Sequence, residues 1–251
     1  MTNGSSPASK PPLCAIVGAG PGNGAAFARK FAKEGYAVVL LARQKERLEA
    51  LAQELPLARA IACDVADPLS IECAFGAIHE EFGAVDTLIY NAGKGVWGSV
   101  EETSPENFES AWRINVFGAF LAARQVIPWM RAAGHGTIVL IGATASRRGG
   151  AKTAAFASAK AAQRSLAESL ARSLGPLGIH VALVVIDGVI DSPQARIMLP
   201  EKPDSFFLQP GAIAETVYFL TQQKKSAWTF ELEVRPFAAR PVTGQNPMAL
   251  P

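Results

Sequence analysis

In residues 13–35 an apolar run leads into a glycine-rich turn and then a helical pattern, an order that few folds share. The run Leu13 to Val17 predicts a buried strand, and glycines follow at positions 18, 20, 22 and 24. Phe27 and Phe31 then share one face of the predicted helix. Strand, glycine turn and helix are typical of a dinucleotide site, because a pyrophosphate can approach the glycine backbone and the free N–H groups of the helix. A glycine-rich turn without a ligand stays open as the alternative.

Length and composition indicate one α/β domain. The chain has 251 residues, 49% of them hydrophobic and 18% charged, which suits one domain with a sizeable core. Its net charge of +2 comes from scattered basic residues, so we predict neither a nucleic-acid nor a membrane partner. We expect a disordered tail over residues 1–10 and a single domain over 11–251.

Cysteine usage and the polar start point to the cytoplasm. The three cysteines, at positions 14, 63 and 73, have no paired spacing and are predicted to be buried thiols in a reducing compartment. Residues 1–10 are too polar for a secretory signal, and no run approaches the length of a membrane span. We therefore expect a soluble, cytoplasmic protein.

The histidines are isolated from one another and do not suggest a metal site. His79 is predicted at an exposed helix position, His135 in a turn, and His180 at a surface position of a strand. We predict no metal ligands in this chain.

Apolar runs alternate with helical patterns along the chain. Strands are expected over 36–42, 58–63, 85–90, 136–141, 179–186 and 228–234, and helices over 44–54, 68–82, 105–132, 153–174 and 210–222. Parallel strands need crossover helices, and right-handed crossovers give one doubly wound sheet. The predicted fold is α/β, of the Rossmann type, with three layers. Residues 193–209 are expected to form a flexible substrate lid, and residues 236–251 an irregular tail.

Five sequence stretches in order resemble the short-chain dehydrogenase/reductase family. They are Gly18-x-x-x-Gly22-x-Gly24, Asp64-Val65, Asn91-Ala92-Gly93, Asn115 and Lys160. The resemblance covers about residues 12–235 and implies a parallel sheet of about seven strands. It also implies a homodimer or homotetramer that binds a small molecule, with helices 105–132 and 153–174 at the interface.

The resemblance also assigns residues to a nicotinamide cofactor. Those around the phosphates would be Gly18, Gly22, Asn23 and Gly24. Those around the adenine and the riboses would be Asp64, Val65, Asn91, Ala92, Gly93 and Lys160. Gly188 and Val189 would contact the nicotinamide amide, and Ser192 keeps a hydroxyl where the family has threonine. Asp187 replaces the family's proline.

Arg43 indicates which cofactor is preferred. It ends the strand at the position that faces the adenosine ribose, where an acidic side chain would bind a free 2′-hydroxyl. A guanidinium can instead hold a 2′-phosphate by two hydrogen bonds. We therefore predict NADP(H) as the preferred cofactor, with NAD(H) and a solvated arginine left as alternatives.

The family's substrate-oxygen partners are both missing. The family has Tyr-x-x-x-Lys, in which the tyrosine passes a proton to the substrate, whereas this chain has Phe156 four residues before Lys160. Ala143, thirteen residues before Phe156, replaces the family's serine. Neither side chain carries a proton that can be transferred, so the usual mechanism is not open to this chain.

Other groups are candidates for the missing roles. Thr144 could hold the substrate oxygen, and Lys160, or a water on an Asn115–Lys160 chain, could supply a proton. Ser158 is predicted to point away from the site. Loss of a general acid costs about 10²- to 10⁴-fold in rate, so reduction of an activated alkene or an imine-like group is a candidate reaction. The apolar Phe156 and Ala143 favour a flat or apolar ligand.

Three hypotheses about function follow from these residues. The first is an NADP(H)-dependent oxidoreductase with an atypical site, favoured because Asn115 and Lys160 remain. The second is a non-catalytic NADP(H)-binding sensor or partner subunit, favoured by the loss at positions 143 and 156. A relative without the cofactor is the third, and the glycine turn, Arg43 and Asn91 argue against it. Residues 94–104, 145–152 and 188–209 would carry substrate specificity, but they contain no recognisable ligand signature.

Overall fold

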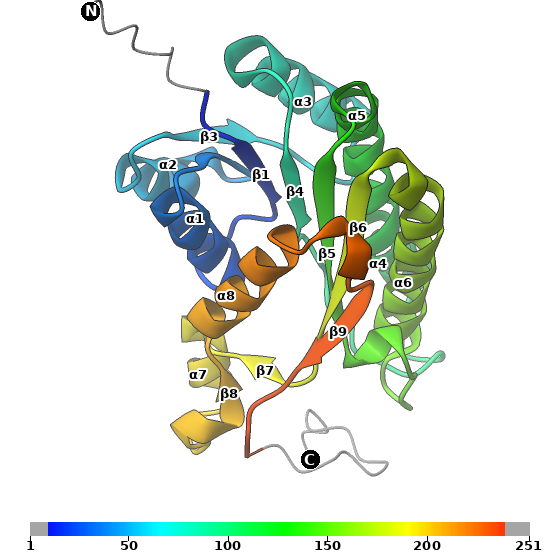
Figure 1. The fold of residues 1–251 in the computed structure, drawn as a ribbon. Coiled ribbons are helices and arrows are strands. Elements are labelled where there is room, and N and C mark those ends of the chain that lie inside the picture. The colour runs from blue at the N-terminus through cyan, green and yellow to red at the C-terminus, as the bar shows by residue number, and fades with distance from the viewer. Residues whose placement is uncertain (1–9, 239–251) are drawn as a thin grey trace, which may run out of the picture.

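The computed structural model of the chain describes residues 10–238 (Figure 1). All but Lys10 of the predicted N-terminal tail lies outside these residues. Most of the predicted C-terminal tail, residues 239–251, lies outside them as well.

The strands form one parallel sheet of seven, in the order β3-β2-β1-β4-β5-β6-β9. The bounds of its strands are β1 Leu13–Val17, β2 Ala37–Ala42, β3 Ala58–Ala62, β4 Thr87–Tyr90, β5 Gly136–Ala143, β6 Ile179–Ile186 and β9 Glu231–Val234. Two short strands, β7 Val189–Ile190 and β8 Phe207–Leu208, pair separately. The predicted doubly wound sheet of about seven strands is confirmed.

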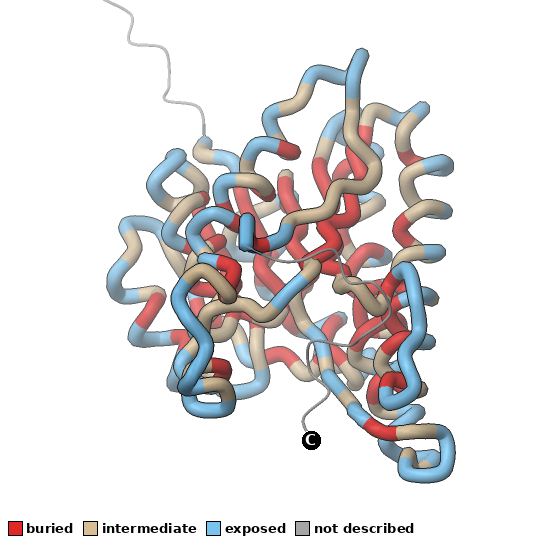
Figure 2. Tube along the Cα trace, turned by 90° about the horizontal axis from the view of Figure 1, so that it is seen from below, coloured by how far each residue is buried: buried red, intermediate tan, exposed pale blue. Residues whose placement is uncertain are grey.

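Helices cover both faces of the sheet, which gives the three predicted layers (Figure 1). On one face lie α1 Asn23–Lys33, α2 Lys45–Gln53 and α8 Pro210–Thr221, and on the other α3 Pro68–Phe82, α4 Pro105–Trp112, α5 Gly118–Ala133 and α6 Ala154–Leu174. Figure 2 shows the buried residues concentrated in the strands between the layers. Parallel strands buried on both faces explain the nearly continuous apolar runs in the sequence.

The long helix predicted over 105–132 is present but is interrupted at Asn115. A π-helical turn, Arg113–Phe117, separates α4 from α5. The amide Nδ2 of Asn115 donates to the carbonyl of Ala111 at 2.9 Å and to that of Lys94 at 3.0 Å. In an α-helix the Ala111 carbonyl would accept from the backbone N–H of Asn115. Because the Asn115 side chain occupies this carbonyl instead, the backbone widens there.

Two predictions of burial were wrong. His180 is 3% exposed, because the Trp228 ring stacks on it at 4.9 Å and the Thr229 carbonyl lies 2.9 Å from Nε2. Cys73 is exposed, since it lies on the outer face of α3, whereas Cys14 and Cys63 are buried as predicted.

The segment predicted to be a flexible lid contains regular structure. It holds the short helix α7, Pro193–Met198, and the strand β8, which pairs with β7. Arg196 in α7 binds Asp191 through two hydrogen bonds of 2.7 and 2.8 Å, which fix the helix to its N-terminal flank. Within residues 10–238 no helix is both long and apolar enough to cross a membrane.

Candidate active site

A cavity of about 440 Å³ opens at the carboxyl edge of the central strands. Its walls come mainly from the segments that follow β4, β5 and β6 and from the start of α6. The side chains that line it include those of Asn91, Trp97, Ala143, Thr144, Phe156 and Lys160. In an open parallel sheet, ligands bind at this edge, where the connections diverge to opposite faces.

The glycine turn after β1 packs directly against the segment after β4. Gly18 has a φ of 84°, and a Cβ on it would lie 2.4 Å from the backbone nitrogen of Ala92. A Cβ on Gly24 would lie 2.5 Å from the Cα of Ala19. The side chain of Asn91 donates to the carbonyl of Gly18 at 2.8 Å and joins the two segments. These two glycines are therefore required by close backbone contact.

Asn23, at the first position of α1, has polar atoms with no hydrogen-bond partner. It is 5% exposed, and both its Oδ1 and Nδ2 lack partners among the described residues. No side chain caps α1, and its first turn holds no acidic residue. Buried amides are normally paired, so this end of the helix suits a polar, anionic group such as the pyrophosphate of a dinucleotide. The donor set and the glycine turn fit such a cofactor.

Lys160 is buried beside the cavity and is held by neutral acceptors. Its Nζ donates to the Ile141 carbonyl at 2.9 Å and to the Oε1 of Gln163 at 3.0 Å. Burial lowers the pKa of Lys160 to about 7. A Cβ on Gly93 would lie 3.7 Å from this Nζ and 3.2 Å from the Oδ1 of Asn115, which has no hydrogen-bond partner among residues 10–238. Lys160 and Asn115 thus come together at Gly93.

Ala143, at the end of β5, and Phe156, in α6, both line the cavity. The Phe156 ring lies 5.2 Å from that of Trp97, with an angle of 50° between them. Trp97 is 47% exposed, so the two rings form an aromatic wall open to a ligand. Ser158 is exposed and bonds to the carbonyls of Ala154 and Ala155, away from this wall.

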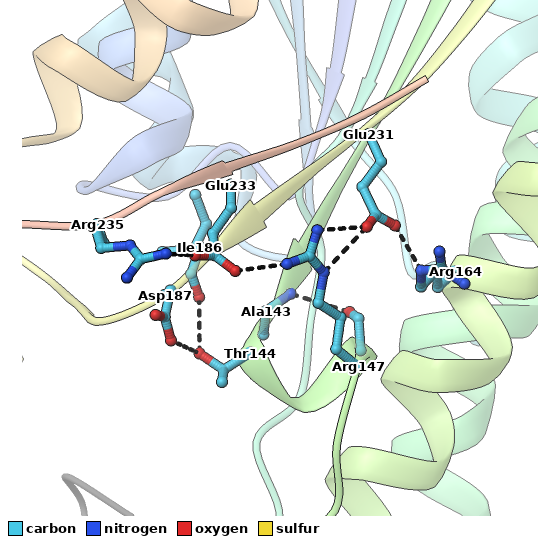
Figure 3. A network of polar contacts seen from close by, with 10 residues as sticks. Ala143, Thr144, Arg147, Arg164, Ile186, Asp187, Glu231, Glu233 and Arg235 are labelled. Atoms are coloured by element: carbon cyan, nitrogen blue, oxygen red, sulfur yellow. Dashed lines mark hydrogen bonds and ion pairs between the residues drawn. The ribbon is translucent and has the colours of Figure 1, made fainter. Parts of the chain in front are cut away.

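Thr144 is joined to Asp187 across the ends of two strands. Its hydroxyl donates to Oδ1 of Asp187 at 2.5 Å (Figure 3). The strands β5 and β6 end in register at Ala143 and Ile186, which places the two residues opposite one another.

Arg43, Asp64 and Val65, which were predicted to contact the adenosine part of the cofactor, follow strands β2 and β3. Arg43 is exposed at the end of β2 and makes no hydrogen bond or ion pair with the described residues. Asp64 accepts from the Ala66 nitrogen at 3.0 Å, and Val65 is buried.

Gly188, Val189 and Ser192 follow β6. Gly188 and Val189 line the cavity, whereas the Ser192 side chain caps α7 by accepting from the Ala195 nitrogen. A Cβ on Gly22 would lie 3.9 Å from the Cβ of Ser192, so the glycine turn and the α7 segment approach one another.

Sequence reasoning missed Gln163 and Trp97. Gln163 is fully buried and its Nε2 lacks a partner in the described chain. Its position three residues after Lys160 on one helix was a usable signal, because such residues share a face. Nothing in the sequence indicated that Trp97 would meet Phe156, since this contact depends on where loop 94–104 folds.

The strand order, the glycine turn at β1 and the cavity at the carboxyl edge define a protein of the Rossmann-type α/β class. The family model described as short chain dehydrogenase matches residues 13–200. The chain belongs to the short-chain dehydrogenase/reductase family, and the resemblance noted in the sequence is confirmed.

Individual proteins that are similar to this chain are also dehydrogenases. The chain is 35% identical over 199 residues to 2-(R)-hydroxypropyl-CoM dehydrogenase of Xanthobacter autotrophicus, covering 75% of this chain and 79% of that protein. A short-chain dehydrogenase structure from Rhodopseudomonas palustris has a TM-score of 0.78 and 35% identity over 90% of this chain and 98% of that one. An alcohol dehydrogenase from Thermococcus sibiricus, complexed with 5-hydroxy-NADP, has a TM-score of 0.83 and 28% identity, covering 92% and 98%.

Proposed function

We propose that this protein is an NADP(H)-dependent oxidoreductase whose active site works without the family's tyrosine and serine. The observation that carries the proposal is the convergence, on one cavity, of Asn91, Gly93 and the buried Lys160. The glycine turn and the unpartnered Asn23 beside it support a bound dinucleotide. When bound, the nicotinamide would give or take a hydride, and the residues of this chain would bind the substrate and move the proton.

Arg43 supports NADP(H) over NAD(H). Its exposed guanidinium stands at the end of β2 with no carboxylate bound to it among the described residues. We expect Arg43→Ala to weaken NADPH binding by about tenfold while NADH binding changes little, because a charge-assisted hydrogen bond contributes about 1.5 kcal/mol or more. Fluorescence titration of each cofactor tests this, and an equal loss for both would contradict it.

The second candidate function is a non-catalytic NADP(H)-binding protein. It is favoured by one observation, the position of Phe156 and Ala143 on the cavity wall, where neither side chain can exchange a proton. On this alternative the cavity would take a ligand without changing it.

The deciding experiment is NADPH titration followed by turnover of carbonyl, enone and alcohol panels. Wild-type turnover that is lost in Lys160→Ala would support the enzyme and exclude the binding protein. A silent wild type beside an active Phe156→Tyr would support the sensor or partner role, because it would show an intact cofactor site without its proton donor. If NADPH failed to bind, both candidate functions would be wrong.

The family and composition also lead us to propose a cytoplasmic homodimer or homotetramer. Exposed aromatic side chains on α4 and α5 support the association of copies through these helices.

A further inference from the structure

The Thr144–Asp187 contact is a polar pair in the region where the family's substrate-oxygen partners are missing. Thr144 follows Ala143 directly and lines the cavity, and Asp187 lies between Ile186 and Gly188, which line it too. The Thr144 Oγ1 lies 2.5 Å from Oδ1 of Asp187 and 3.4 Å from the Ile186 carbonyl (Figure 3). The carboxylate is therefore the main acceptor of the hydroxyl proton.

The hydrogen bond to Asp187 determines whether Thr144 can donate to a ligand or accept from it. A threonine hydroxyl has one proton and two lone pairs, and a carboxylate only accepts. Since the proton is directed at Asp187, the oxygen of Thr144 offers lone pairs to the cavity. While Asp187 is ionised, such an oxygen can accept from a substrate hydroxyl and has no proton to donate to a substrate carbonyl.

Two further polar side chains of the cavity, those of Thr153 and Lys160, bond to uncharged partners. The hydroxyl of Thr153 donates to the Gly150 carbonyl and accepts from the Gly150 nitrogen. Lys160 donates to Ile141 and Gln163. Neither is joined to a carboxylate, so in the described cavity Thr144 is the hydroxyl with an ionisable acceptor behind it.

We propose that Thr144 and Asp187 together accept the hydroxyl proton of a secondary alcohol, so that this enzyme oxidises alcohols by a route that bypasses the missing tyrosine. The proposal rests on the proposed oxidoreductase function and adds the proton acceptor, the direction of reaction and the substrate class. Thr144 touches the substrate, and Asp187 is the base that acts through it.

Oxidation of the alcohol breaks two bonds and forms one. The C–H bond of the alcohol breaks, and its electron pair leaves as hydride to an oxidised nicotinamide dinucleotide. The substrate O–H bond breaks, and its electron pair forms the second C–O bond of the ketone. The released proton goes to the Thr144 oxygen, whose own proton passes to the Asp187 carboxylate and from there to water.

The cavity walls indicate the substrate class. Trp97 and Phe156 form the aromatic wall, and Val189 and Ile190 also line the cavity. Flat rings pack well against such surfaces. The substrate is therefore a secondary alcohol that carries a planar apolar group, such as an aryl alcohol.

The pair is held by its backbone. The Asp187 nitrogen donates to the Val234 carbonyl at 2.8 Å, which fixes it to the edge strand β9. Gly188 has a φ of 155°, and a Cβ there would lie 2.9 Å from the Leu208 side chain. The chain can therefore turn sharply after Asp187 without moving the carboxylate away from Thr144.

The test uses the full chain with 1-tetralol and 1-tetralone as a matched alcohol and ketone. NADPH titration comes first, because failure to bind would overturn the proposed function and the proton route with it. With cofactor bound, ligand binding is then measured by tryptophan fluorescence and oxidation of 1-tetralol by NADPH formation. The variants are Thr144→Val, Thr144→Ser and Asp187→Asn, with Glu168→Gln on the outer face of α6 as the control for loss of a carboxylate.

We expect the wild type with NADP⁺ to bind the alcohol more tightly than the ketone and to oxidise it. Thr144→Val should lose the binding preference, and Thr144→Ser should keep it. Asp187→Asn and Thr144→Val should lower the oxidation rate by about 10²- to 10⁴-fold, the usual cost of losing a general base. Glu168→Gln should match the wild type in both readouts.

Three results would overturn the proposal while leaving cofactor binding intact. These are equal or tighter binding of the ketone by the wild type, a preference retained in Thr144→Val, and no oxidation of the alcohol by the wild type. Oxidation of 1-tetralol by Asp187→Asn at the wild-type rate would show that the carboxylate is not part of the proton route.

Discussion

At the scale of single residues, the site combines a buried amine with an apolar surrounding. Lys160 is 6% exposed, and its two acceptors, the Ile141 carbonyl and the Gln163 amide, are uncharged. Removing an ammonium from water without a counter-charge is costly, which lowers the pKa of Lys160 from 10.5 to about 7. The amine can thus exist in either protonation state near neutral pH.

This shift makes stability depend on pH in a defined window. Between about pH 7 and 10.5 the unfolded chain binds a proton at Lys160 that the folded chain has lost, so wild-type stability rises with pH. Relative to Lys160→Met, we expect the free energy of unfolding to rise by about 1.4 kcal/mol per pH unit across this window. Urea unfolding of both proteins at several pH values measures the difference. It should be constant below about pH 6, and a difference independent of pH throughout would contradict a lowered pKa.

Of the glycines in the turn after β1, Gly18 is required by the backbone conformation and Gly20 is not. Gly18 has a positive φ and no room for a Cβ, whereas nothing lies within 4 Å of a Cβ on Gly20. We expect Gly18→Ala to destabilise the protein by about 3 kcal/mol, from the strained φ and the clash with Ala92. Gly20→Ala should change stability by less than about 0.5 kcal/mol. Chemical denaturation measures both, and equal effects would show that the turn rearranges.

At the scale of elements, the turn after β5 is anchored to the edge strand. Arg147 binds Glu231 at 2.6 Å and Glu233 at 2.8 Å, and Arg164 of α6 shares Glu231 (Figure 3). The anchor holds residues 144–152, which form part of the cavity rim, against β9. Partly buried carboxylates with two arginines make this network stronger than isolated surface pairs.

Removing the anchor should loosen the turn without unfolding the protein. For Arg147→Ala we expect faster amide hydrogen exchange over 144–152 and a loss of global stability below about 1 kcal/mol. Arg172→Ala is the matched control, because its contacts to Glu168 stay within α6 and its side chain is 79% exposed. Unchanged exchange in the turn, measured by mass spectrometry, would show that Ala143 and its neighbours hold the turn alone.

At the scale of the whole molecule, one surface of α4 and α5 is unusually aromatic. The Trp112, Phe117 and Phe120 rings stack at 5.9 and 6.4 Å, and Trp112 and Phe120 remain 43% and 39% exposed. Contiguous apolar surface of this kind marks sites of association.

Charges on this surface should disrupt association. We expect Trp112→Glu with Phe120→Glu to shift sedimentation toward the monomer while the circular dichroism spectrum stays native. Leu69→Glu is the control, since Leu69 is 70% exposed at the start of α3, far along the chain from this surface. A double variant with wild-type mass would place the interface elsewhere.

Most of the fold could be predicted from local sequence, because apolar runs and helix signals act over short distances. The start of α3 is an example: Asp67 accepts from the Leu69 nitrogen and Pro68 occupies the first turn, as the residue types predict. Failures came where distant residues decide the outcome. The Trp228 ring buries His180, and the Asn115 amide binds the Lys94 carbonyl and helps to widen the helix at residues 113–117.

The sheet, the glycine turn, the family and the lack of a tyrosine at position 156 could all be predicted from the amino-acid sequence, because each depends on residue identity and spacing along the chain. The residues that surround position 156 in space could not be predicted in the same way. The contacts of Thr144 with Asp187 and of Phe156 with Trp97 join segments that are distant or on different elements, so they depend on packing. A hydroxyl can donate, accept or point to water, and its chemistry is set by the group that the folded chain brings within hydrogen-bond distance.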